Sequence, residues 1–179
     1  MDFFIILSIL ILIFLAIYFS IYFFYAFFYF ILPMIFYGAF FAKIDDRSIE
    51  NMINLANIKS GQKIVDLGSG DGRLVIALAK AGAIAYGFEI NPFLVYTSKR
   101  KIKKAGLDKK AFIKQSNFWN EDLSGFDAIT IFGIKFIMED LEKKLKKELK
   151  PGAIVISKYF TFPNWKPIKN LEMINLYKK

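Results

Sequence analysis

The strongest constraint on this chain is a long apolar segment near its start. From Phe3 to Ala42 no side chain is charged, and almost every residue is apolar. About 20 apolar residues are enough for a helix to cross a bilayer, so this segment is longer than one span requires. A secretory signal would have a basic start and a small-residue cleavage site, and neither is evident here. We therefore expect a retained membrane anchor.

Two topologies of this anchor are compatible with the sequence. In the first, a single helix covers residues 3–29, Pro33 breaks it, and residues 34–41 lie at the membrane interface. In the second, two spans form a tight hairpin that turns near Ser20, although no Gly, Pro or Asn marks a turn there. We favour the first topology.

The distribution of charge divides the chain at Lys43. All 25 Lys and Arg residues lie from Lys43 onward, whereas only Asp2 of the 16 acidic residues precedes it. We therefore expect an anchor over residues 1–42 and a basic domain over residues 43–179, which would face the cytoplasmic side or its equivalent. Attraction to anionic lipid headgroups or to an acidic partner would follow from this charge. A general preference for lysine and isoleucine in the composition is the explanation of this charge that we favour. The lysines form no single compact stripe, so we expect no nucleic-acid partner.

Two missing residue types narrow the possible chemistry. The sequence contains no Cys and no His, which excludes disulfides, thiolate metal sites and histidine-dependent hydrolases. We expect no metal site. Any reaction must use carboxylates, lysines, tyrosines, amides or a bound cofactor.

Beyond Lys43, short apolar strands alternate with helical segments. Strands are expected over residues 63–67, 84–89, 111–114, 128–132, 153–157 and 171–177, and helices over residues 48–56, 73–81, 92–105 and 139–149. This alternation predicts right-handed crossovers and a doubly wound, mostly parallel α/β sheet with helices on both faces. Asp46 or Ser48 can cap the first of these helices.

The sharpest local signal is the segment VDLGSGDG at residues 65–72. Its three glycines allow the backbone to approach a ligand, and the turn lies at the carboxyl edge of the sheet, where open α/β folds bind ligands. The spacing differs from the GxGxxG pattern of dinucleotide sites, and Asp66 and Asp71 would repel a pyrophosphate. Both carboxylates would instead attract the cationic amino and sulfonium groups of S-adenosylmethionine.

Two further elements follow in the order that such a cofactor requires. Glu89 ends the second strand, where a carboxylate can accept two hydrogen bonds from a ribose diol. Asn117 and Phe118 follow the third strand, where an amide can pair with the adenine edge and a ring can cover its face. Together with the glycine turn, they predict an adenosyl-type cofactor.

These segments resemble the class I, or seven-β-strand, S-adenosylmethionine-dependent methyltransferases. DLGSGDG resembles their motif I, and FEINP resembles the acidic motif that follows it. With the runs GFEINPFLVY, IFGIKFIMEDLEKKLKKEL and FTFPNW, the sequence is most similar to the lysine N-methyltransferases of the ATP synthase c subunit and the adenine nucleotide translocase. Those enzymes also carry an apolar membrane segment before the catalytic domain. The resemblance covers residues 46–167 and implies a Rossmann-like fold, but the few residues after Ser157 leave open whether the last strand of the sheet forms.

The resemblance implies methyl transfer to a lysine side chain of a protein, and of a membrane protein in particular. The residues expected to bind the cofactor are Asp66, Gly68, Ser69, Gly70, Asp71, Glu89, Asn117 and Phe118. Phe132 and Gly133 would face the transferred methyl group, and the stretch from Tyr159 to Trp165 would line the acceptor channel.

An acceptor lysine must be neutral to attack, and an aromatic channel would desolvate it and hold the cationic product. The same aromatic residues could equally do no more than cover the edge of the sheet, and no general base can be named. A lipid or quinone acceptor is the alternative enzymatic function. A scaffold that binds the cofactor without consuming it is the non-enzymatic one.

Overall fold

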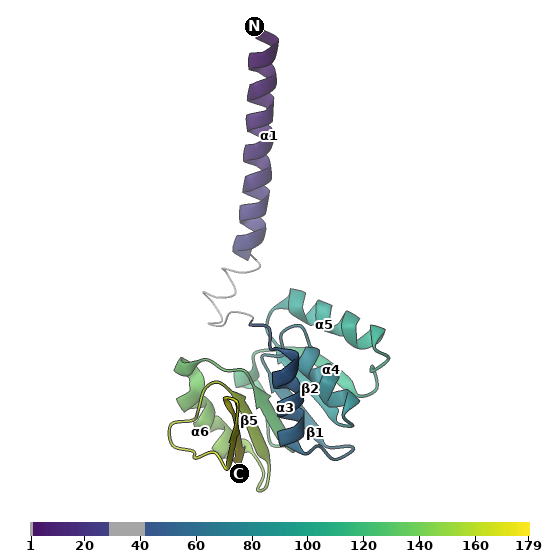
Figure 1. Cartoon of the computed structure of the whole chain (residues 1–179), viewed down its shortest axis with the longest axis vertical. Helices are drawn as coiled ribbons and strands as arrows, with labels where there is room; N and C mark the ends of the chain where they lie inside the picture. Colours follow the sequence, from purple (N-terminus) through teal and green to yellow (C-terminus); the bar gives the residue numbers. More distant parts are fainter. Residues whose placement is uncertain (1, 29–41) are drawn as a thin grey trace. The chain divides into compact units, whose positions relative to one another are not determined.

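The computed structural model describes residues 2–28 and 42–179, which belong to two compact units, residues 1–40 and residues 41–179 (Figure 1). In the first unit, α1 is one helix over Asp2–Ala26. It passes through Ser20 without a turn, so the hairpin alternative is wrong; no turn-forming residue interrupts the helical pattern there. By length and composition its segment Phe3–Ala26 is a candidate membrane span. The predicted break at Pro33 and the interfacial residues 34–41 lie outside the described residues.

The second unit is built around a seven-stranded sheet with the order β3-β2-β1-β4-β5-β7-β6. The strands are β1 Lys63–Leu67, β2 Ile84–Glu89, β3 Ala111–Gln115, β4 Ala128–Ile131, β5 Ile154–Lys158, β6 Lys169–Leu171 and β7 Ile174–Lys178. The first five strands are parallel, and β7 is antiparallel to both β5 and β6. The predicted doubly wound sheet is therefore confirmed.

The last strand, which the sequence left open, does form. Glu172 and Met173 adopt φ values of 49° and 61°, and this left-handed pair makes the tight turn that joins β6 to β7. No helix separates β5 from β6, so the few residues after β5 are enough to close the sheet.

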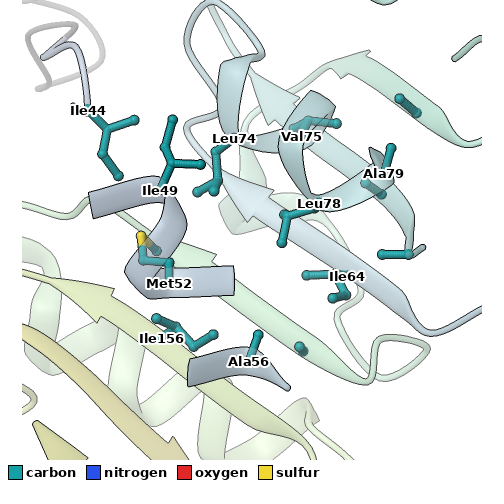
Figure 2. Packing of buried hydrophobic residues seen from close by; sticks show 14 of the residues in the cluster. Ile44, Ile49, Met52, Ala56, Ile64, Leu74, Val75, Leu78, Ala79 and Ile156 are labelled. Atoms are coloured by element: carbon teal, nitrogen blue, oxygen red, sulfur yellow. The ribbon is translucent and has the colours of Figure 1, made fainter. Parts of the chain in front are cut away.

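Helices cover both faces of the sheet, as predicted, but unequally. The helices of this unit are α3 Asp46–Ala56, α4 Arg73–Lys80, α5 Pro92–Lys104 and α6 Met138–Glu148. Buried residues of α3, α4 and α5 form one core with the sheet, and Figure 2 shows Met52 of α3 close to Ile156 of β5 in this core. On the opposite face α6 is the one α-helix among the described residues, and half-buried aromatic side chains from the loops complete that core.

The start of α3 differs from the prediction in its cap. Asp45, rather than Asp46 or Ser48, is the N-cap residue, and its Oδ1 accepts a hydrogen bond from the Ser48 backbone N–H at 2.8 Å. Asp46 already has a helical place in the first turn, so its side chain cannot reach the free N–H groups that a preceding residue reaches. The cap fixes the point at which the chain enters this unit.

Candidate functional site

The ends of the parallel strands bring most of the predicted residues to one edge of the sheet. Strands β1, β2 and β4 are in register, with Leu67 beside both Phe88 and Ile131. The segments that follow these strands, together with those after β3 and β5, therefore meet at the carboxyl edge, which is where sheets of this kind bind ligands.

The glycine turn after β1 is fixed by its backbone. The N–H groups of Gly68 and Ser69 both donate to the Phe88 carbonyl oxygen, at 2.9 and 3.0 Å. Gly68 has φ of 78°, and a Cβ added there would meet nothing within 4 Å, so this side of the turn is open. The turn therefore combines a fixed backbone with an approachable surface.

Two glycines in this region allow close packing. Gly72 has φ of 77°, and a Cβ there would lie 2.8 Å from Ser98 Cβ on α5. A Cβ on Gly87 of β2 would lie 2.6 Å from Ser69 Oγ. Ser98 also donates a hydrogen bond from its hydroxyl to the Gly70 carbonyl oxygen at 2.8 Å. The turn, β2 and α5 are thereby locked together.

Glu89 lies at the centre of this half of the edge. Its side chain is buried, and its two carboxylate oxygens accept hydrogen bonds from the backbone N–H groups of Gly70 and Asn91, each at 2.8 Å. No Lys or Arg of the described residues forms an ion pair with it. A carboxylate has about four acceptor positions, so two remain for a ligand.

Asp66 is a buried carboxylate at the end of β1. It accepts a hydrogen bond from the Thr130 hydroxyl of β4 at 2.8 Å and has no basic partner among the residues that the structure describes. Burial raises the pKa of Asp66 to about 7, the Thr130 hydrogen bond opposes this rise, and the charge of nearby Glu89 adds to it. A cation placed between the two carboxylates would relieve their repulsion.

The sequence suggested that the Asp71 carboxylate attracts the cationic groups of the cofactor, but in the structure it already pairs with two basic side chains. Its carboxylate forms a bidentate ion pair with Arg73, at 2.9 and 2.7 Å, and a second ion pair with Lys101 of α5 at 2.6 Å. Burial opposes ionisation, but the hydrogen bonds from Arg73 and Lys101 outweigh it and hold the pKa of Asp71 well below its usual range. Arg73 also donates to the Ile44 carbonyl oxygen at 3.2 Å. Asp71 therefore joins α4, α5 and the segment before α3, and its charge is already compensated.

Asn117 and Phe118 lie in the segment after β3. The Asn117 side-chain oxygen accepts from the Trp119 backbone N–H at 3.1 Å and starts the short 3-10 helix η2 Phe118–Asn120. The Phe118 and Trp119 rings lie 5.1 Å apart. Ser116, just before them, donates its backbone N–H to the Glu89 carbonyl oxygen at 3.0 Å. The structure thus brings this segment to the end of β2, where Glu89 lies.

The other half of the edge, after β4 and β5, is aromatic. The rings of Phe132 and Tyr159 lie 5.3 Å apart, and Tyr159 adopts φ of 67°, a left-handed conformation that is costly for a residue with a large side chain. Lys158 is buried beneath this pair: its Nζ lies 4.7 Å from the centre of the Tyr159 ring and donates to the Glu172 carbonyl oxygen at 3.0 Å. Gly133 is buried next to Met138, since a Cβ there would meet Met138 Sδ at 2.8 Å.

Trp165 is not brought to this aromatic pair. Its ring packs 5.4 Å from Tyr177 of β7 and 5.6 Å from Phe162, within the core on the α6 face. Phe160 and Phe162 also contribute to that core. Tyr159 therefore makes the ring contact with Phe132. The aromatic residues that follow it, Phe160, Phe162 and Trp165, mainly cover the sheet.

Several residues at this edge, other than the predicted Ser69, had no signal in the sequence. Ser69 Oγ and Ser116 Oγ are buried with no hydrogen-bond partner among the described residues, and both lie next to Glu89 or its strand. Thr130, Lys101 and Lys158 contribute through contacts with residues far away in the sequence. A buried hydroxyl without a partner needs one, and a ligand at this edge would supply it.

Comparisons with known proteins agree with this geometry. The family described as the ANTKMT methyltransferase domain matches residues 66–169. Over 127 residues the chain is 41% identical to the lysine N-methyltransferase of the ATP synthase c subunit from Rattus norvegicus, a match that covers 71% of this chain and 58% of the rat protein. Over 124 residues it is 35% identical to a protein-lysine N-methyltransferase of Saccharolobus islandicus, a match that covers 68% of this chain and 77% of that protein.

A solved structure extends the comparison to three dimensions. The RNA methyltransferase of Salinibacter ruber, in complex with S-adenosyl-L-homocysteine, matches with a TM-score of 0.71 and 30% identity, over 76% of this chain and 91% of that one. The chain spans little more than half the length of the rat relative that it matches.

Proposed function

Because the chain belongs to the family of the ANTKMT methyltransferase domain, we propose that it transfers a methyl group from S-adenosylmethionine to a lysine side chain of a protein. The observation that carries this proposal is the Glu89 carboxylate, which is buried at the carboxyl edge and oriented by two backbone N–H groups. Its free acceptor positions suit a diol.

The residues around Glu89 fit the rest of this cofactor. When bound, S-adenosylmethionine supplies a methyl group that its sulfonium charge activates. The uncompensated carboxylate of Asp66 suits a cationic group, the open side of Gly68 leaves room for a close approach, and Ser69 and Ser116 have buried hydroxyls that a ligand could satisfy. Asn117 and Phe118, in the segment after β3, are the candidates to recognise an adenine. Asp71 contributes indirectly, since its ion pairs hold the turn against α4 and α5.

Phe132 and Tyr159 provide the acceptor side of the proposed site. An amine must lose its proton before it attacks, and the ordinary lysine pKa of about 10.4 opposes this. The apolar faces of the two rings desolvate an incoming amine and lower its pKa. The buried ammonium of Lys158, 4.7 Å from the Tyr159 ring, acts in the same direction because like charges repel. These residues thus promote the neutral acceptor without a histidine.

We assign residues 1–42 to an anchor and residues 43–179 to the catalytic domain. The support for this division is the candidate span in α1 and the placement of every Lys and Arg after residue 42. In this arrangement the domain faces the cytoplasmic or equivalent side, and a membrane protein is the acceptor within reach.

Radiolabelled methyl transfer tests the proposal. The full chain in lipid nanodiscs is incubated with S-adenosylmethionine labelled in its methyl group and with membranes, and lipid and protein fractions are then separated. We expect label on protein, at a lysine identified by mass spectrometry. Glu89→Gln should remove at least about 99% of it, because the diol loses a charged acceptor (roughly 3 kcal/mol). Glu139→Gln, which changes an exposed carboxylate of α6, is the matched control and should label normally.

Other outcomes of this experiment point to other functions. Label in the lipid fraction would replace the lysine acceptor with a lipid or quinone. Cofactor binding without any transfer would favour a scaffold. Failure of the chain to bind the cofactor would contradict the whole proposal.

A further inference from the structure

The outer side of α5 carries a surface that the proposed reaction does not use. Val95, Ser98 and Ile102 point into the protein. The opposite side exposes two aromatic and four basic side chains, which we call the α5 face: Phe93, Tyr96, Lys99, Arg100, Lys103 and Lys104. The sequence of this helix contains no acidic residue.

The charge of the α5 face is not compensated in the way that charge on α6 is. On α6, Lys143, Lys144 and Lys146 each form an ion pair with a carboxylate of the same helix. On α5, Lys101 pairs with Asp71, but no ion pair involves the four basic residues of the α5 face within the described residues. Their positive charge is therefore directed outward and is not neutralised locally.

Aromatic rings lie toward the amino-terminal end of the same surface. Tyr96 is 61% exposed and Phe93 is 47% exposed, and the Arg100 guanidinium lies 5.8 Å from the centre of the Tyr96 ring. Exposed rings next to Lys and Arg are typical of the membrane interface, where a ring enters the headgroup zone and the cations pair with phosphate groups.

We propose that the α5 face docks on the anionic surface of a lipid bilayer. The unneutralised charge favours an anionic partner, the exposed Tyr96 ring beside Arg100 favours a lipid interface over a fully polar one, and α1 supplies a segment long and apolar enough to hold the chain at a membrane. This inference does not depend on the methyl acceptor. Because β2 ends at Glu89 and α5 begins at Pro92, the amino-terminal end of the docked face lies beside the carboxyl edge.

A fluorescent probe on α5 tests the docking in the full chain. The sequence has no cysteine, so Thr97→Cys provides a single labelling site on α5, and Lys147→Cys provides a matched site on α6. Each labelled protein is placed in nanodiscs of neutral lipid or of neutral lipid with about a third of an anionic phospholipid, together with a lipid-borne quencher. We expect quenching at residue 97 in the anionic discs alone, and no quenching at residue 147 in either.

Charge removal identifies the side chains responsible. Lys103→Gln with Lys104→Gln should weaken docking by roughly fivefold for each cation removed, or about 25-fold for the pair. Lys147→Gln with Lys166→Gln removes the same charge elsewhere and should leave the quenching unchanged. Salt near 0.5 M should abolish the quenching, because it shortens the range of the attraction.

Three results would overturn the proposal. The first is equal quenching of the residue 97 probe in neutral and anionic discs, and the second is quenching that survives removal of the two lysines. The third is an unquenched probe in anionic discs whose fluorescence instead responds to a single-stranded RNA oligonucleotide, which would assign the α5 face to nucleic acid.

Discussion

The carboxyl edge of the sheet is held in two different ways on its two halves. Beyond β1 and β2, backbone hydrogen bonds and ion pairs fix each group: Gly70 to Glu89, Ser98 to Gly70, and Asp71 to two cations. Beyond β4 and β5, ring and thioether contacts dominate, between Phe132 and Tyr159 and between Gly133 and Met138.

The difference suits the two ligands of the proposed reaction, a cofactor whose structure is constant and an acceptor whose surroundings vary. Directional bonds specify one geometry, which a cofactor of constant structure needs. Aromatic rings and a flexible thioether tolerate small shifts, which an acceptor presented by another macromolecule needs. The following variants test whether the two halves really differ in this way, beginning with the largest expected effect.

Adding a methyl group to each half of the carboxyl edge should show which half is packed rigidly and which half can adjust. Gly72→Ala combines φ of 77° with a contact of 2.8 Å to Ser98 Cβ, and we expect the free energy of unfolding to fall by about 3 kcal/mol or more. Gly133→Ala meets Met138 Sδ at the same 2.8 Å, but Met138 can change rotamer, so we expect a loss of about 1 kcal/mol. Chemical denaturation of the full chain in detergent measures both, and equal losses would contradict the comparison.

The pKa of Asp66, about 7, should make cofactor binding depend on pH. Below that pH the carboxyl is neutral and cannot pair with a cation, so we expect affinity for S-adenosylmethionine to fall by up to about tenfold per pH unit between pH 7 and pH 5. Calorimetry at several pH values measures this. Asp66→Asn should bind weakly at pH 7.5 and show no such dependence, whereas Asp71 stays ionised throughout because its pKa is lowered.

The same group has a consequence for the stability of the empty protein. A carboxyl whose pKa is raised by folding binds its proton more tightly in the folded state, so stability falls as pH rises from about 4 to about 7. Asp66→Asn should remove this decrease in the free energy of unfolding. An unfolding free energy of the wild type that is flat over this range would contradict the raised pKa.

Removing the Tyr159 ring should affect only the half of the carboxyl edge after β4 and β5, which is the half proposed to bind the acceptor. Tyr159→Gly deletes the ring and relieves the left-handed backbone at φ of 67°, so the variant should fold with unchanged or higher stability. We expect kcat/KM for the acceptor to fall about tenfold while the Kd for the cofactor stays within about twofold, since aromatic contacts of this kind contribute roughly 1 kcal/mol. A weakened cofactor Kd would indicate that the two halves are not separate.

Trp165→Phe should have the smallest effect on the reaction. Its ring packs against Tyr177 and Phe162 in the core on the α6 face, so we expect a loss of about 1 kcal/mol in unfolding free energy. The rate per folded molecule should not change. Thermal unfolding and methyl transfer measured on the same sample distinguish this role from that of a channel residue, for which the rate would fall with little change in stability.

The sequence predicted the first half of the edge better than the second. Strands β1 and β2 have the predicted bounds, because each is a short apolar run that stops at a glycine turn or at an acid followed by Ile-Asn-Pro. The turn between β6 and β7 carried no such signal, since Glu172 and Met173 adopt positive φ without being Gly or Asn.

Contacts between distant residues account for most of what the sequence could not predict. The ion pair of Asp71 with Lys101 had no local signal, because Lys101 comes 30 residues later in the sequence. Trp165 and Tyr159 belong to one aromatic run, yet the turn after β5 sends them to different places. Residue type indicated the chemistry of each position, whereas the packing of the whole sheet decided which positions share a site.

The hydrogen bond from Arg73 to the Ile44 carbonyl oxygen decides at which side the chain enters the second unit. It attaches the segment before α3 to the residue that follows the glycine turn, so Ile44 lies by the carboxyl edge of the sheet and not at the opposite end of the strands. An anchor that precedes this segment would therefore be joined to the unit on the side of the proposed reaction. Tethering of this kind raises the effective concentration of acceptors in the same membrane, so modest intrinsic affinity for them would be sufficient.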